Sequence, residues 1–243
     1  KNICKNVKVV IHTAGMNAHD CALDPVGAIE FNGVATAKLV QATVAVGVKK
    51  FIYLSTAHVY SSPLVGEIDE ESCLTNKHPY ATSHVAGENA VLYQSNISDN
   101  FTGIVLRLSN GIGAPTHKYA NCWMLAVNDF CRQVVENGKI MVNSPREVER
   151  DFVPISLICE IINSFVSQKK TESCVINVSS STTTSLQEMT DMIRGRAKLI
   201  LGFEPEVVFK CKEELDKAPK LSISNIKLKE IVVSENNTEE EID

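Results

Sequence analysis

The chain has 243 residues, of which 44% are hydrophobic and 22% are charged, which is typical of one large globular domain or two small ones. No apolar run approaches the roughly 18 residues that a membrane-spanning helix needs, so we expect no membrane span. The formal net charge of -5 argues against a protein that binds nucleic acid non-specifically, because such proteins are usually basic.

The eight cysteines are scattered along the chain and form no C-x-x-C pair. This spacing argues against a zinc site and against a small disulfide-stabilised scaffold. We therefore expect reduced, mostly buried thiols, no metal and a cytoplasmic location. The sequence starts with a lysine and contains no signal peptide, so we interpret it as a piece of a longer chain.

The first part of the chain alternates between buried strands and helices. Apolar, β-branched runs predict strands at residues 7–12, 51–55 and 103–108. The stretch from Pro25 to Val46 contains only two charged side chains, so we expect a helix that is covered on two sides. Pro79 suits the first turn of a second helix, which we expect to end near Gln94. This β-α-β-α-β order predicts a parallel sheet with right-handed crossovers.

Beyond residue 110 the pattern is less regular. We expect helices at about residues 121–136, 156–167, 186–201 and 224–231. We expect strands at residues 139–142, 174–178 and 206–209. Ser185 and Glu188 have the spacing of a capping box at the start of the third of these helices. The segment from Arg150 to Pro154 is expected to lead into the second of them.

Polar side chains at the end of the second strand and in the following helix carry the chemical signal. Thr56 lies at a strand tip, where open α/β sheets bind their ligands. Tyr80 and His84 are four residues apart, so they lie on one face of a helix. A hydroxyl, a phenol and a basic group in one crevice suit proton transfer to or from an alcohol or carbonyl. Because an ordinary phenol has a pKa near 10, Tyr80 needs a nearby positive charge to act as a base.

These segments resemble the short-chain dehydrogenase/reductase superfamily, specifically its extended NAD-dependent epimerase/dehydratase branch. Residues 55–61 match the family's Ser-Ser/Thr-x-x-Val-Tyr-Gly strand end, and Tyr80-x-x-x-His84 matches its Tyr-x-x-x-Lys helix. The resemblance implies that Thr56 orients the substrate oxygen and that Tyr80 is the acid/base. It places His84 where the family has a lysine that binds the nicotinamide ribose and lowers the tyrosine pKa. The alternative is that Tyr80 is a packing residue and His84 a surface histidine without an acid/base effect.

Further matches extend the resemblance on the cofactor side. The segment Thr13, Ala14 and Gly15 resembles a strand end whose backbone passes the cofactor. Asn32 opens a match to the family's Asn-x-x-Gly-Thr segment, whose Asn supports the active site and the cofactor. Ser55, Tyr80 and His84 complete the implied cofactor contacts, and the implied cofactor is NAD or NADP.

Three residues are implied on the substrate side. Asn110 ends a match to Leu-Arg-x-x-Asn, where the Asn contacts a nucleotide-sugar, and Arg150 begins a match to Arg-Asp-Phe/Tyr-Val/Ile, where the Arg binds the diphosphate. A guanidinium fork suits that dianion. His58 is a substrate contact or a residue that lines a loop. Arg150 has the alternative of an ion pair with a neighbouring acid at the surface.

The resemblance implies an α/β fold, the C-terminal part of a Rossmann-like doubly wound parallel sheet, with a smaller, interleaved C-terminal substrate-binding lobe. We expect residues 1–110 to form the nucleotide-cofactor domain without its first strands and residues 111–243 to form mostly the lobe. Residues 151–180 are expected to return to the first sheet. We also expect a homodimer through the helices at 25–46 and 79–94, as the family often forms.

Three departures from the family qualify the expected activity. The 243 residues contain no glycine-rich G-x-x-G-x-x-G phosphate loop, so we expect this piece to bind NAD poorly by itself. His84 replaces the lysine, and a neutral imidazole supplies no charge. Ala57 and His58 follow Thr56 in place of the Asp-Glu pair of nucleotide-sugar 4,6-dehydratases, which makes water elimination less favoured.

The predicted function is an NAD(P)-dependent epimerase or oxidoreductase that acts on a nucleotide-sugar by hydride transfer. One alternative on the same fold is a reductase of a small or lipid-like ketone. The other is a cofactor-sensing or scaffold module with impaired catalysis.

Overall fold

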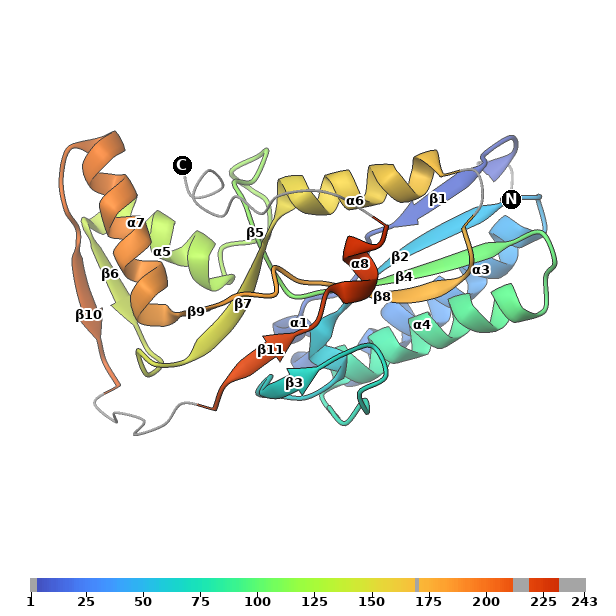
Figure 1. Cartoon of the computed structure of the whole chain (residues 1–243), viewed down its shortest axis with the longest axis horizontal. Helices are drawn as coiled ribbons and strands as arrows, with labels where there is room; N and C mark the ends of the chain where they lie inside the picture. Colours follow the sequence, from blue (N-terminus) through green and yellow to red (C-terminus); the bar gives the residue numbers. More distant parts are fainter. Residues whose placement is uncertain (1–3, 169–170, 212–218, 232–243) are drawn as a thin grey trace.

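A four-stranded sheet forms the centre of the computed structural model, which describes residues 4–168, 171–211 and 219–231 (Figure 1). The strands have the order β1-β2-β4-β8, and all neighbours are parallel. Their bounds are β1 (Val9–His12), β2 (Lys50–Thr56), β4 (Thr102–Leu108) and β8 (Cys174–Val178). The predicted α/β class with a parallel sheet is confirmed.

Helices cover both faces of this sheet, as expected of a doubly wound fold (Figure 1). They are α3 (Thr36–Val44) and α4 (Pro79–Asn96) on one face and α6 (Ile155–Ser167) on the other. Successive side chains of β2 point to opposite faces, so Phe51 and Tyr53 pack with Val91 of α4 while Ile52 packs with Ile161 of α6. Burial on both faces explains the nearly continuous apolar runs of these strands.

The stretch predicted as one helix from Pro25 is helical but not uniform. It is divided into α2 (Pro25–Ala28), the π-helical segment η2 (Ile29–Ala35) and α3, and α1 (Ala18–Leu23) precedes it. The π-helical segment carries the buried Asn32 and Gly33. A Cβ on Gly33 would lie 3.1 Å from the Cβ of Ala86, so the glycine lets this segment approach α4 closely.

A second group of elements lies at the other end of the molecule (Figure 1). Here α5 (Ala126–Asn137) and α7 (Leu186–Leu201) share an apolar core with the parallel pair β6 (Lys139–Val142) and β10 (Glu206–Phe209). The capping box predicted for α7 is present. Helix α5 starts five residues later than predicted, because the backbone before it closes turns such as that from the N–H of Ala120 to the carbonyl of His117.

Short strands that the sequence analysis missed lie between the two ends. A three-stranded sheet contains β5 (Asn110–Ile112), β7 (Glu149–Pro154) and β9 (Thr183–Ser185), and a parallel pair contains β3 (Gly66–Ile68) and β11 (Leu221–Ile223). A four-residue helix, α8 (Ile226–Lys229), follows. The sequence analysis assigned no strand to the segment at Arg150, which lies in β7; the buried carboxylate of Asp151 can sit inside this strand because it accepts hydrogen bonds from Ser109 and Ser180.

The boundary expected at residue 110 stays a prediction, although β8 does return to the first sheet beside β4. All eight cysteines are free thiols, but the expectation that most of them are buried was wrong, because only Cys21 is fully buried and Cys73 and Cys159 are exposed. Among the described residues, no helix combines the length and apolar character that crossing a membrane requires.

Candidate active site

The end of β2 and the start of α4 bring Thr56 and Tyr80 together. Helix α4 begins here because Pro79 takes its first turn and the Nδ1 of His78 accepts a hydrogen bond from the N–H of Tyr80 at 3.2 Å. The buried Thr56 hydroxyl accepts the N–H of His58 at 3.1 Å, capping the short 3-10 turn η3 (Ala57–Val59). Its own proton is free for the hydrogen bond that it makes with Tyr80. The two predicted catalytic oxygens therefore share one environment.

The phenol of Tyr80 is not activated in this environment. Burial raises the pKa of Tyr80, and the hydrogen bond with Thr56 only partly opposes that effect. The ring centroids of Tyr80 and His84 lie 4.4 Å apart. The pKa of His84 is lowered, chiefly by burial, against the smaller effects of the Tyr80 backbone and Glu88. The imidazole is therefore neutral at pH 7 and does not supply the charge that the tyrosine needs.

A backbone hydrogen bond determines which nitrogen of His84 carries the proton. The Nδ1 atom lies 2.7 Å from the carbonyl oxygen of Tyr80. A carbonyl only accepts, so Nδ1 is the donor, and in the neutral ring Nε2 keeps a lone pair. A Cβ on Gly15 would lie 3.5 Å from this Nε2 and 3.5 Å from the Oδ1 of Asn32. The loop after β1 thus passes close to both predicted cofactor contacts.

Asn32 is buried and its hydrogen bonds are made within the protein. Its Oδ1 accepts the N–H of Met16 at 2.8 Å, and its Nδ2 donates to the hydroxyl of Ser83 at 3.0 Å. Asn32 therefore ties the loop after β1 to α4 and holds Thr13, Ala14 and Gly15 in place beside His84. This arrangement agrees with a supporting role at the site.

Ser55 points away from the predicted cofactor contacts, into the packing between β2 and α4. Its hydroxyl donates to the Oε1 of Glu88 at 2.5 Å. Glu88 also forms a buried ion pair with Arg107 of β4, with 2.7 Å between Nη2 and Oε2. The sequence analysis gave no role to Glu88 or Arg107. The spacing of Glu88 four residues after His84 was the available signal, because it places Glu88 on the same helix face.

The three predicted substrate contacts converge near the tip of β2. His58 is hydrogen-bonded to Asn110, and its pKa is lowered by burial first and then by the charge of Arg150. The Nδ2 of Asn110 donates to the carbonyl of Asp151 at 2.9 Å. Burial also lowers the pKa of Arg150, which remains a cation at neutral pH. His58, Asn110 and the guanidinium of Arg150 therefore lie near one another, just after β2, at the start of β5 and near the start of β7.

The residues on the β1 side fit the nicotinamide riboside part of a dinucleotide. The backbone is accessible at Thr13, Ala14 and Gly15, because these residues are exposed and carry no bulky side chain. The Nε2 of His84 offers an acceptor suited to a ribose hydroxyl. The phenol of Tyr80 lies beside it. An acceptor such as Nε2 suits a hydroxyl group, which can donate to it, better than a phosphate, which needs donors.

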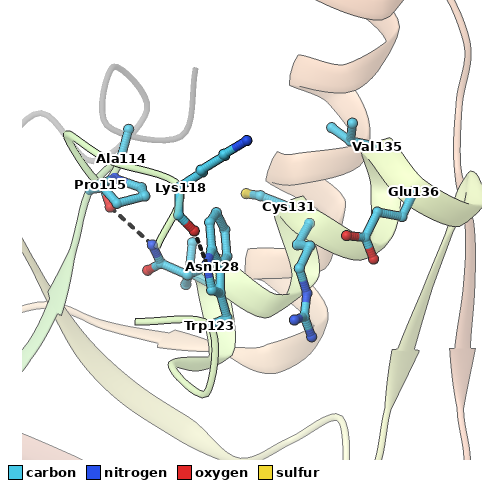
Figure 2. A pocket seen from close by; sticks show the side chains of 11 residues that line it. Ala114, Pro115, Lys118, Trp123, Asn128, Cys131, Val135 and Glu136 are labelled. Carbon is cyan, nitrogen blue, oxygen red and sulfur yellow. Dashed lines mark hydrogen bonds between the residues drawn. The ribbon is translucent and has the colours of Figure 1, made fainter. Parts of the chain in front are cut away.

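A separate pocket of about 510 Å³ lies between α5 and the loop that follows β5 (Figure 2). Figure 2 shows Trp123 and Asn128 held by hydrogen bonds to the carbonyls of Lys118 and Gly113. Most of its lining is apolar, and none of the predicted site residues belongs to it. The sequence analysis did not find this pocket, because loop and helix residues without a shared period form it.

Comparison with known proteins agrees with this geometry. The NAD dependent epimerase/dehydratase family matches residues 1–179. The chain belongs to this family. The mouse dTDP-D-glucose 4,6-dehydratase is 29% identical over 166 residues, which cover 67% of this chain and 44% of that protein. UDP-glucose 4-epimerase 3 of rice (Oryza sativa subsp. japonica) is 32% identical over 111 residues, which cover 45% of this chain and 30% of that protein. The chain thus matches less than half the length of these curated relatives.

Solved structures share the fold. The structure of MoeE5 in complex with UDP-glucose and NAD superimposes with a TM-score of 0.83 at 18% identity, covering 99% of this chain and 78% of that one. UDP-glucuronic acid 4-epimerase from Bacillus cereus, in complex with NAD, gives 0.81 at 18% identity, with coverage of 99% and 73%. RMD from Pseudomonas aeruginosa, complexed with NADPH, gives 0.77 at 24% identity, with coverage of 97% and 78%.

Proposed function

We propose that this member of the epimerase/dehydratase family acts on a nucleotide-sugar, exchanging a hydroxyl proton through Tyr80 while a hydride moves between the sugar and NAD or NADP. The hydrogen bond between Thr56 and Tyr80 at the tip of β2 supports this proposal most directly. It places two hydroxyl groups where one substrate oxygen can contact both of them. The substrate and cofactor class is supported by MoeE5, which is known in complex with UDP-glucose and NAD, and by UDP-glucuronic acid 4-epimerase from Bacillus cereus, which is known in complex with NAD.

Each side chain has a defined task in this proposal. Thr56 holds the substrate oxygen, and Tyr80 takes the proton from the alcohol or returns it to the carbonyl. His84 accepts a ribose hydroxyl at Nε2, and Asn32 keeps the loop around Gly15 in place. The bound nicotinamide supplies the hydride acceptor and donor. Return of the hydride to the opposite face of the sugar gives epimerisation, whereas its retention gives net oxidation.

The substrate's diphosphate is assigned to Arg150, with Asn110 and His58 beside it. A guanidinium is the preferred partner of a phosphate because its planar fork donates two parallel hydrogen bonds. The hydrogen bond from Asn110 to the Asp151 carbonyl orients the amide. This placement favours a nucleotide-activated substrate over a small ketone, because a small ketone has no anionic group to pair with the Arg150 guanidinium.

A second candidate function is a cofactor-sensing module without turnover. The neutral His84 beside a tyrosine whose pKa burial raises favours it, because neither group is charged at pH 7. Binding of the cofactor without reduction of NAD by candidate sugars or any other turnover, unchanged by His84→Lys, would support this function over catalysis.

The test is Tyr80→Phe in the full chain, with both the nicotinamide absorbance and the conversion of the sugar followed during incubation with UDP- and dTDP-sugars, because epimerisation regenerates the cofactor and leaves its absorbance unchanged. We expect kcat to fall by about a hundredfold or more, because general acid–base catalysis contributes at least that much, while cofactor binding is kept. Tyr93→Phe is the matched control, since Tyr93 is an exposed tyrosine on the same helix. Undiminished turnover in Tyr80→Phe would refute the proposal.

A further inference from the structure

Glu88 shares one face of α4 with the two site residues that precede it. Tyr80, His84 and Glu88 follow one another at intervals of four residues, so their side chains line up along the helix. Glu88 is 1% exposed. Its carboxylate accepts hydrogen bonds from Ser55 at 2.5 Å and from the Nε and Nη2 of Arg107 at 3.1 Å and 2.7 Å. One helix residue is thus bonded to both central strands of the sheet.

Arg107 carries the connection onward to β8. Its Nη1 donates to the hydroxyl of Tyr60 at 2.9 Å, and Tyr60 donates to the Oδ1 of Asn177 at 2.7 Å. The guanidinium also lies over the Tyr60 ring, 4.9 Å from its centroid. Every member of this chain of contacts is buried. The network therefore joins α4, β2, β4, β8 and the turn after Thr56 at defined atoms.

Stability alone does not account for such a network. Two charges lose their hydration on burial, so a buried ion pair is often no better for folding than apolar side chains of similar volume. What the pair adds is directional contact, because a bidentate guanidinium tolerates only a narrow range of positions. The apolar packing of α4 against the sheet is close but not directional, so the ion pair adds a constraint of a different kind.

The anchored atoms lie next to the proposed reacting groups. Ser55 is the chain neighbour of Thr56, and Glu88 is two helical turns from Tyr80 on the same rigid helix. A shift of α4 along the sheet would carry the phenol away from the Thr56 hydroxyl. The Ser55–Glu88 bond opposes that shift at the strand tip itself, and the Arg107–Glu88 pair opposes it from the neighbouring strand.

We propose that Glu88, held by Arg107, is a positioning residue that keeps the Tyr80 phenol in contact with the Thr56 hydroxyl. This inference rests on the proposed function for its catalytic consequence, while its structural consequence can be measured without any substrate. Glu88 touches neither substrate nor cofactor in this scheme and acts only through α4.

The test replaces the ion pair by apolar side chains of similar size, Glu88→Leu with Arg107→Met, in the full chain. Thermal unfolding measures whether the fold is kept. The titration of Tyr80 is followed by ¹³C NMR of tyrosine labelled at Cζ and assigned with Tyr80→Phe. We expect a cooperative fold, a Tyr80 pKa above that of the wild type because the Thr56 hydrogen bond is lost, and a kcat about a hundredfold lower. Glu204→Gln, which removes an exposed ion pair with Lys198, serves as the control.

Glu88→Gln is the second variant, for the case in which the double replacement does not fold. It keeps the shape and the acceptor for Ser55 but loses the charge that holds Arg107, so we expect a smaller change in the same direction. Folded variants with the Tyr80 titration and kcat of the wild type would overturn the positioning role. Absence of turnover in the wild type would instead count against the proposed function, and the Tyr80 titration would still decide the role of Glu88.

Discussion

A Cβ atom on Gly87 would lie 2.6 Å from the hydroxyl oxygen of Tyr53. Real Cβ atoms do not come that close, so only glycine lets α4 lie directly on β2 at this point. A side chain here would also lie 3.1 Å from the carbonyl of Asn32. The close approach occurs one residue before Glu88. It determines how near α4, which carries Tyr80 and His84, can lie to β2.

We predict that Gly87→Ala destabilises the protein. The added methyl group must displace Tyr53 or α4, and such overpacking costs about 1–3 kcal/mol in the free energy of unfolding. Gly195→Ala is the matched control, because Gly195 also lies within a helix but has open space at its Cβ. It should stabilise the protein by up to about 1 kcal/mol through helix propensity. Urea unfolding measures both, and equal effects would contradict the steric explanation.

His84→Lys is predicted to lower the pKa of Tyr80 by restoring a cation beside it. An opposite charge within hydrogen-bonding range lowers the pKa of an acid by about 1–3 units, so the rising limb of the pH–rate profile, where Tyr80 loses its proton, moves to lower pH. Turnover at pH 7 should rise at least about tenfold. His84→Gln keeps a polar side chain without charge and should produce no such movement. A profile that is the same in all three proteins would show that this position does not control the tyrosine.

Arg150→Gln is predicted to weaken the binding of the nucleotide-sugar. Loss of a charge-assisted contact to the diphosphate costs about 1.5–3 kcal/mol, which corresponds to a KM roughly ten- to a hundredfold higher. The kcat should change little, since Arg150 is not assigned to the reacting atoms. Arg146→Gln is the control, because the Arg146 side chain is half exposed and contacts Glu147 and the ring of Phe209 rather than any predicted site residue. An unchanged KM would favour a substrate without a diphosphate.

The stability of the protein is predicted to fall as the pH drops below about 6.5, the ordinary pKa of histidine. Burial lowers the pKa values of His12, His58 and His84 in the folded protein. Below about pH 6.5 the unfolded chain therefore binds protons that the folded chain does not, and the free energy of unfolding decreases until the folded pKa values are reached. Urea unfolding between about pH 7.5 and pH 5.5 measures this slope.

Single substitutions identify the histidines that are responsible. His84→Asn should reduce the slope, whereas His19→Asn should leave it unchanged because His19 is exposed. A flat stability curve across this range would contradict the prediction, because it would show that folding does not lower the pKa values of these histidines.

We propose that the chain forms a homodimer through the helical stretches 25–46 and 79–94. Phe31 is 49% exposed on η2 and Tyr93 is 64% exposed on α4, so apolar surface of the expected face is uncovered. Phe31→Glu should convert a dimer measured by light scattering into a monomer. Leu199→Glu, at a 75% exposed position on α7, is the control and should not alter the mass. A monomeric wild type would remove the proposal.

Local patterns predicted a large part of this molecule. Strand β2 was recognised because both faces of a parallel strand are apolar, and the start of α4 because Pro79 suits a first turn. The strand-tip position of Thr56 and the four-residue spacing of Tyr80 and His84 placed their side chains near one another. None of these inferences requires knowledge of a distant residue.

Contacts between distant residues decided the rest. The burial of Asp151 within β7 depends on Ser109 and Ser180, whose hydroxyl groups donate hydrogen bonds to its carboxylate. The sequence by itself determined the order of strands and helices and the face that bears Tyr80 and His84, because backbone geometry repeats within each element. Only the tertiary structure decided that His84 is neutral and that Glu88 is bonded to Arg107, because burial and hydrogen-bond partners arise when separate elements pack together.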